Sequence, residues 1–240
     1  MHRFFLQNVP TTDTHMLIND KRVVDQLKKV LRFQKGEHFI TFDGSGYEYE
    51  LVFQELLPQG VRAEILEKRS GNREPKAQIT LYQSLLKRDH FEYVLQKGVE
   101  LGVSRFVPMI TQRTIVSDVS ANKILRYSKI IIEATEQCGG VRVAQLSPAM
   151  RFSAALREVA TEGGINLIAW VGEKRTDLSK VLDQCGIIGC HFNIFVGPEG
   201  GFTDGEISKA KEYGMRSMNL GKRILRAETA GMAIVARILL

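Results

Sequence analysis

Two short glycine-bearing segments constrain the fold of this chain more than any other feature. The first is residues 195–202, Phe-Val-Gly-Pro-Glu-Gly-Gly-Phe, and the second is residues 220–226, Leu-Gly-Lys-Arg-Ile-Leu-Arg. Each follows an apolar run typical of a strand, and each precedes the start of a helical pattern. A strand that passes through a short glycine loop into a helix is the repeating unit of a parallel α/β sheet. The second half of the chain is therefore expected to hold such a sheet.

The same alternation extends over the chain after residue 75. Apolar runs predict strands at residues 78–85, 105–110, 165–171, 191–196 and 215–220. Helical spacing predicts helices at residues 89–101, 178–185, 206–213 and 227–239, and a longer one that ends near Gly139 and Gly140. On the buried face of this longer helix we place Ile124, Leu125, Ser128, Ile131, Ile132 and Thr135. We expect a parallel sheet with helices on both faces.

The beginning of the chain has a different pattern. Residues 68–75 are polar and lack apolar periodicity, so we place a domain boundary there, between residues 1–72 and residues 73–240. Asp20 is a plausible N-cap for a helix over residues 21–31. Strands are expected at residues 38–43, 47–53 and 61–66, the first two joined by the turn Asp43-Gly-Ser-Gly46. The first domain is predicted to be small and rich in strands.

Composition excludes several classes of protein. The chain has 240 residues, 44% of them hydrophobic and 25% charged, which is typical of a globular protein. No stretch is apolar enough to span a membrane, and the start lacks a signal-peptide core, so we expect a cytoplasmic protein with no membrane partner. The three cysteines contain no C-x-x-C pair, and the five histidines have no ligand spacing. We therefore expect reduced, buried thiols, no metal, and histidines that are structural or on the surface.

The net charge of +6 is unevenly distributed. Residues 1–72 carry ten basic and ten acidic side chains, so the whole basic excess lies in residues 73–240. A basic surface favours a polyanionic partner such as RNA, because neutralising phosphates drives much of the affinity for nucleic acids. A solvated surface without such a partner is the alternative.

The first glycine segment is the better candidate for a ligand site. Thr203 and Glu206 have the spacing of a capping box, so the segment leads directly into a helix. Glycines at 197, 200 and 201 let a ligand approach the backbone, whose N–H and C=O groups suit an adenine edge or a ribose. The chain has no P-loop, dinucleotide-binding, zinc-protease or G-x-S-x-G motif. A tight strand-to-helix turn without a ligand remains the alternative.

The second glycine segment adds charge and apolar surface. Ile224 and Leu225 can form a shelf for a purine, while Arg223 and Arg226 face an anionic substrate. Glu228 lies in the first turn of the last helix, where a carboxylate is favoured even without a function. Because both glycine segments follow strands, we expect them to share one pocket. Residues 133–139 are taken as a polar helix end.

These segments, with others in the same order, resemble one known family. The matching residues are 1–5, 29–32, 95–97 with 100–102, 136–139, 197–202, and 220–226 with 228–230. The chain resembles the RsmE family, bacterial 16S ribosomal RNA uridine-N3 methyltransferases of the SPOUT superfamily. One departure is Gly140, where many members carry arginine; here Arg142 follows two positions later.

The resemblance implies a fold, a cofactor and partners. It implies a PUA-like RNA-binding β-barrel over residues 1–72 and a trefoil-knotted SPOUT α/β domain with a parallel sheet over residues 73–240, in a homodimer. S-adenosyl-L-methionine would be held by Val171, Gly172, Glu173, Val196, Gly197, Pro198, Glu199, Gly200, Gly201, Leu220, Gly221, Ile224, Leu225, Thr229 and Ala230. The partner would be 16S ribosomal RNA within the small ribosomal subunit, contacted by Arg3, Arg32 and Arg223.

The implied reaction is a 16S rRNA (uracil-N3)-methyltransferase reaction. Uracil N3 is a poor nucleophile until its proton leaves, so the site must stabilise a uracil anion and align it. Arg226 is the candidate for stabilising that charge, and Glu228 for accepting the proton or orienting Arg226. Two alternatives are an enzyme that methylates transfer RNA or a ribose hydroxyl, and a non-catalytic RNA-binding or ribosome-assembly factor.

Overall fold

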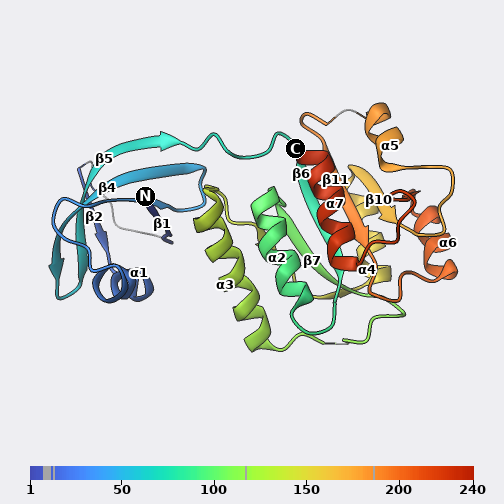
Figure 1. The fold of residues 1–240 in the computed structure, drawn as a ribbon, viewed down its shortest axis with the longest axis horizontal. Coiled ribbons are helices and arrows are strands. Elements are labelled where there is room, and N and C mark those ends of the chain that lie inside the picture. The colour runs from blue at the N-terminus through green and yellow to red at the C-terminus, as the bar shows by residue number, and fades with distance from the viewer. Residues whose placement is uncertain (8–11, 13, 117, 186) are drawn as a thin grey trace. The chain divides into compact units, whose positions relative to one another are not determined.

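A computed structural model describes residues 1–7, 12, 14–116, 118–185 and 187–240; the side chains of Gln184 and Cys185 also lie outside the described part. The chain forms two compact units, whose folds are drawn in Figure 1. The first consists of Met1–Glu74 and Thr135–Val143, and the second of Pro75–Ala134 and Ala144–Leu240. The division near residue 75 falls at the polar stretch, whereas the inclusion of Thr135–Val143 in the first unit was not anticipated.

The first unit contains a five-stranded sheet. Its strands are β1 (His2–Phe5), β2 (His15–Ile18), β3 (His38–Phe42), β4 (Tyr47–Leu57) and β5 (Gly60–Ser70). Their order is β1-β3-β4-β5-β2, with β1 parallel to β3 and the other pairs antiparallel. The three predicted strands are confirmed, the last two being longer than expected, while β1 and β2 were missed. The strands pack against a short helix, α1 (Lys21–Asp25), which continues as a π-helical turn, η1 (Gln26–Val30).

The core of the first unit forms between the sheet and this helix. Phe4, Phe39 and Leu51 from the strands pack with Val23 and Leu27, and all are buried. Burying each such side chain contributes about 1.5–3 kcal/mol relative to exposure. The Asp20 side chain accepts a hydrogen bond from the Val23 N–H, so the predicted N-cap is confirmed.

One ion pair and several hydrogen bonds attach the end of a long helix, α3 (Ala121–Cys138), and the residues after it to the rest of the first unit. Glu136 Oε1 accepts hydrogen bonds from Arg22 (2.9 Å) and from the Phe5 N–H (2.8 Å). Arg3 binds Glu48 at 2.7 Å and also donates to the carbonyl of Gly140 at 3.2 Å. These contacts explain why a helix end that looked merely polar belongs to this unit.

Glu48 is the buried acid of this cluster. Burial by itself raises the pKa of Glu48, but hydrogen bonds from Arg69 and Arg3 outweigh this effect and hold its pKa below the usual value. The side chains of Arg3 and Glu48 are only 8% and 9% exposed. Losing one partner would therefore leave an uncompensated buried charge.

The second unit contains a seven-stranded sheet in which every pairing is parallel. Six strands follow the order β12 (Arg216–Met218), β10 (Ile165–Ala169), β11 (His191–Val196), β6 (Gln78–Ser84), β7 (Arg105–Ile110) and β8 (Gln145–Leu146). The seventh, β9 (Met150–Arg151), also pairs with β7. The predicted parallel α/β sheet is confirmed; the two-residue strands β8 and β9 were missed.

Helices cover both faces of this sheet. The helices are α2 (His90–Leu101), the first part of α3, α4 (Phe152–Glu162), α5 (Leu178–Cys185), α6 (Asp204–Glu212) and α7 (Ala227–Leu239). Tyr82 of β6 points toward α4, where its hydroxyl donates to Glu158 at 2.7 Å. The next residue, Gln83, lies against Gly231 of α7. Because successive strand residues point to opposite faces, α4 and α7 lie on opposite sides of the sheet.

Three expectations need correction. On α3, Ile131 and Thr135 are buried as predicted, but Leu125, placed on the same face, is 70% exposed, and Tyr127 and Ala134 are buried without having been predicted. Helix α4 was not predicted. Cys138 and Cys190 are half-buried rather than buried, and Cys185 lies outside the described side chains. Within the described residues, no helix is long and apolar enough to cross a membrane.

Candidate functional site

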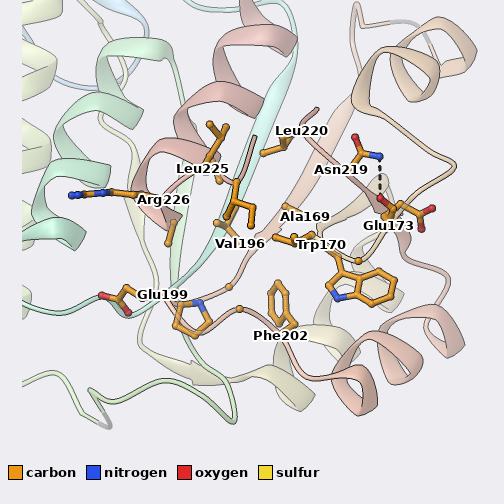
Figure 2. Close-up of a pocket in the computed structure, with 18 of the residues that line it drawn as sticks. Ala169, Trp170, Glu173, Val196, Glu199, Phe202, Asn219, Leu220, Leu225 and Arg226 are labelled. Atoms are coloured by element: carbon orange, nitrogen blue, oxygen red, sulfur yellow. Dashed lines mark hydrogen bonds between the residues drawn. The ribbon is translucent and has the colours of Figure 1, made fainter. Parts of the chain in front are cut away.

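Loops at the carboxyl ends of β10, β11 and β12 surround one pocket in the second unit (Figure 2). The three strands are neighbours and parallel, so their carboxyl ends meet at the same edge of the sheet. The pocket has a volume of about 1020 Å³. This is at the upper end of the range for small-molecule sites.

The pocket gathers nearly all the residues assigned to it from the sequence. The residues that line it from that set are Val171, Gly172, Glu173, Val196, Gly197, Pro198, Glu199, Gly200, Gly201, Leu220, Gly221, Ile224, Leu225 and Ala230. Arg223, Arg226 and Glu228 line it as well. Thr229 is exposed on α7 and is not among the lining residues. The two glycine loops thus share one pocket, as expected.

Several other lining residues were not predicted. Trp170 and Phe202 form an aromatic part of the wall, and the Arg226 side chain extends away from their rings in Figure 2. Arg113 lies in the loop after β7. Ligands bind at the carboxyl ends of parallel strands, and applying this expectation to β7 as well would have identified Arg113. His90, at the start of α2, had been treated as structural or on the surface, and no sequence pattern pointed to the pocket.

The first glycine loop, residues 197–203, is held by neighbouring segments. Arg113 Nη1 donates to the Gly200 carbonyl at 2.8 Å, and the Lys87 N–H donates to Glu199 Oε1 at 3.0 Å. The predicted capping box is confirmed: Thr203 Oγ1 accepts from the Glu206 N–H, and Glu206 Oε2 accepts from the Thr203 N–H. This loop is fixed before any ligand enters.

Glu173 fixes the loop after β10. Its Oε2 accepts from Ser217 Oγ at 2.5 Å, and its Oε1 accepts from the N–H groups of Lys174 and Arg175. These hydrogen bonds, above all that from Ser217, lower the pKa of Glu173 to about 2. The Glu173 carbonyl accepts from Asn219 Nδ2 at 3.1 Å (Figure 2). The carboxylate is therefore ionised at neutral pH and already used within the protein.

Arg226 and Glu228 bring opposite charges to the start of α7. Arg226 is exposed, and its guanidinium makes no hydrogen bond or ion pair with any residue that the structure describes. Glu228 is only 13% exposed and lies in the first turn of the helix, where the helix dipole favours a carboxylate. Its Oε1 lies 3.6 Å from Nδ1 of His90. The pocket thus has an unpaired cation and a sheltered carboxylate two residues apart.

The remaining predicted RNA contacts, Arg3 and Arg32, belong to the first unit. Arg3 is buried against Glu48, so an RNA contact would require its guanidinium to leave this partner. Arg32 is exposed and has a left-handed backbone with a φ of 54°. Among the described residues, no group of three or more His, Cys, Asp or Glu side chains is placed to hold a metal ion.

Comparison with known proteins agrees with this geometry. Residues 72–239 match the family model of the RNA methyltransferase domain. Two relatives are named ribosomal RNA small subunit methyltransferase E. The one from Synechocystis sp. is 34% identical over 212 residues, which cover 88% of this chain and 69% of that protein. The one from Mesomycoplasma hyopneumoniae is 30% identical over 239 residues, or 99% of this chain and 98% of that protein.

A solved structure is similar over the whole fold. It is a ribosomal RNA small subunit methyltransferase E from Neisseria gonorrhoeae bound to S-adenosyl methionine, 33% identical, with a TM-score of 0.87. The similarity covers 99% of this chain and 96% of that one. The resemblance read from the sequence is thereby confirmed, and this chain belongs to the ribosomal RNA small subunit methyltransferase E family of RNA methyltransferases.

Proposed function

We propose that this chain uses S-adenosyl-L-methionine to methylate N3 of a uridine in 16S ribosomal RNA. The carrying observation is the single pocket bounded by three strand-end loops, with Arg226 and Glu228 on its wall. A methyl donor needs a deep, preformed pocket, and a uracil that loses a proton needs a nearby cation and a proton acceptor. Membership of the family supports the same reaction.

The residues of the pocket fit such a cofactor. The backbone N–H groups of residues 222–225 have no partner among the described residues, so they are available to an adenine edge or a carboxylate. The carboxylates of Glu199 and Glu228 suit a ligand with cationic sulfonium and ammonium groups. Val196 and Leu225 supply apolar surface for a purine. Three loops with donors, acids and apolar walls match the mixed chemistry of this molecule.

The chain's own residues would then prepare the uracil. When bound, S-adenosyl-L-methionine supplies an electrophilic methyl group. Arg226, whose guanidinium has no partner in the part of the chain that the structure describes, stabilises the negative charge that develops on the uracil carbonyl oxygens. Glu228 accepts the N3 proton, since it is the partly buried carboxylate nearest in sequence to that cation. Thr229, also assigned to the cofactor from the sequence, lies on the exposed side of α7 and outside the pocket lining.

The RNA partner follows from the same chemistry. N3 lies on the pairing edge of uracil, so the base must be unpaired or flipped out of its helix to react. Arg223 at the pocket and Arg32 in the first unit are exposed cations suited to phosphates, and Arg3 is available only if it leaves Glu48. We place the substrate within the small ribosomal subunit, the protein in the cytoplasm, and its active form as a homodimer.

The finer features of the fold are also part of this proposal. The segment after β12 returns from the sheet edge to α7, which packs on β11 and β6, and so passes the loops that follow β10 and β11. A trefoil knot requires a return path of this kind. In the first unit, register shifts between β4 and β5 at Glu50/Leu51 and Phe53/Glu55 favour a sheet curled into a PUA-like barrel.

The test is a methyl-transfer assay. Purified protein is mixed with S-adenosyl-L-methionine and small ribosomal subunits that lack native N3-methyluridine, and nucleosides are resolved by mass spectrometry. We expect N3-methyluridine that depends on both protein and cofactor. A methyl group on another atom or on transfer RNA would overturn the substrate assignment. Failure to bind the cofactor would favour a non-catalytic RNA-binding or ribosome-assembly factor.

A further inference from the structure

His90 lines the pocket, and its contacts within the described structure do not account for a purely structural role. It is the first residue of α2 and lines the pocket beside Glu228. Its Nδ1 is buried and has no hydrogen-bond partner among the described residues. Buried polar atoms in folded proteins nearly always have a partner, so this nitrogen needs an explanation.

The fold itself places the imidazole there. The Lys87 N–H donates to Glu199, which ties the segment before α2 to the first glycine loop. Arg88, two residues before His90, has a left-handed backbone with a φ of 56°, which is uncommon for arginine. Such strain is often found at functional sites, where the surrounding structure maintains it. Helix α2 packs on α7, which carries Glu228. The two side chains therefore meet through packed elements of one unit.

The separation of the two groups fits a weak contact that can shorten. Nδ1 of His90 is 3.6 Å from Oε1 of Glu228, longer than the usual 2.7–3.2 Å of a hydrogen bond. Catalytic hydrogen bonds are often long without substrate and shorten when it binds. Other charged groups on the segments that meet here are Lys87, Arg88, Asp89, Glu199 and Arg226.

We propose that His90 is a positioning residue that donates its Nδ1–H to Glu228, holding this carboxylate in place to accept the N3 proton of uridine. The inference rests on the proposed function. In the proton transfer, the N3–H bond breaks, an O–H bond forms on Glu228, and the electron pair stays on N3.

The first test is the rate of methylation in single turnover with saturating RNA, measured together with the dissociation constant for the cofactor. In His90→Ala the rate should fall about tenfold while the cofactor binds equally tightly, because Glu228 loses the donor that holds it toward the N3 proton. His90→Asn, whose amide can still donate, should recover most of the rate. His38→Ala, which removes an exposed imidazole in the first unit, is the matched control and should leave the rate unchanged. An unchanged rate in His90→Ala, or no recovery in His90→Asn, would overturn the proposal.

The second test does not depend on activity. The free energy of unfolding of the cofactor-free protein is measured in urea for His90→Ala, for Glu228→Gln and for the double variant. If the two side chains contact each other, the double variant should lose less than the sum of the two single losses. Additive losses would overturn the pairing. If the losses are not additive but no N3-methyluridine is formed by the unmodified protein, the pairing stands and the proposed reaction fails.

Discussion

The two glycine loops line the same pocket but are held in very different ways. The loop at residues 197–203 receives hydrogen bonds from Lys87 and Arg113 and ends in the capping box of α6. The loop at residues 219–226 is anchored at its start, where Asn219 bonds the Glu173 carbonyl and Gly221 donates to Asn219. From residue 222 to residue 225, its backbone N–H groups have no partner within the described structure.

This difference suggests that the first loop shapes the pocket and that the second loop supplies groups that contact the ligands. The first loop forms a wall that is held in place by hydrogen bonds to the Gly200 carbonyl and to Glu199 Oε1. Within the described structure, the second loop presents backbone donors without a partner at residues 222–225, the 78% exposed side chain of Ile224, and an Arg226 guanidinium without a hydrogen bond or ion pair. Unused polar groups are the ones that a ligand can bind without breaking an internal contact. Substitution of Arg226 in the second loop should therefore change catalysis most, and substitutions around the first loop should mainly change cofactor affinity.

The largest expected effect is at Arg226. Arg226→Ala should slow single-turnover methylation by about 10²–10³-fold, because a preorganised donor to the developing charge is lost. The rate of Arg226→Lys should lie between those of the unmodified protein and Arg226→Ala, since lysine keeps the positive charge but lacks the planar guanidinium with its several N–H donors. The dissociation constant for the cofactor, measured by calorimetry, should stay unchanged. A full rate in Arg226→Ala would show that the second loop does not carry the chemistry.

The next largest effect is expected at Arg113, which holds the first loop through its hydrogen bond to the Gly200 carbonyl. Arg113→Ala removes the charged donor to the Gly200 carbonyl, and hydrogen bonds from charged groups contribute about 1.5–3 kcal/mol. We expect the cofactor to bind about tenfold more weakly, with a smaller change in the single-turnover rate at saturation. Arg157→Ala, an exposed arginine on α4, is the control. Equal affinities in the two variants would mean that the remaining contacts hold the loop without Arg113.

The sequence predicted those contacts of the site that join residues close together along the chain, and it missed those that join distant residues. The capping box joins Thr203 and Glu206, three residues apart, and was found from spacing alone. Arg113 and Gly200 are separated by 87 positions along the chain, and Lys87 and Glu199 by 112 positions. No local pattern encodes such pairs, because the strand order that brings them together is set by the whole sheet. His90 was assigned no function for the same reason.

The same limit applies to the fold. Long apolar runs predicted β6, β7, β10 and β11, whose burial on both faces leaves a clear signal. The strands β1 and β8 were missed because segments of four and two residues are too short for periodicity to show. Leu125 was placed on the wrong side of α3. Helical spacing shows which side chains share one face of a helix, but it does not show which face packs against the rest of the protein. The ion pair of Glu136 likewise depends on Arg22, 114 positions away.

A matched pair of glycines tests the difference in rigidity directly. Gly201 and Gly221 have φ values of 67° and 101°, and a Cβ at either would touch no neighbour within 4 Å. Alanine therefore reports only on the backbone. Gly201→Ala should lower the free energy of unfolding by about 1 kcal/mol, since a left-handed conformation is held there. Gly221→Ala should cost less than half of this, because its loop can readjust. An equal or larger loss at Gly221, measured by urea unfolding, would mean that both loops are rigid.

The smallest effect concerns Glu173, the anchor before the second loop. Its folded pKa of about 2 lies below the ordinary value of 4.5, so its charge stabilises the fold fully above about pH 4.5. Below that, the stabilisation falls and is lost as the pH approaches 2. Because Glu173 is only half-buried, solvent screening keeps the effect small, and Glu173→Gln should lower the free energy of unfolding by about 1 kcal/mol or less at pH 7. Urea unfolding from pH 7 to pH 3 should show the two proteins converging below pH 4.5. A gap that stays constant to pH 3 would show that the Ser217 and backbone hydrogen bonds, rather than the charge, anchor the loop.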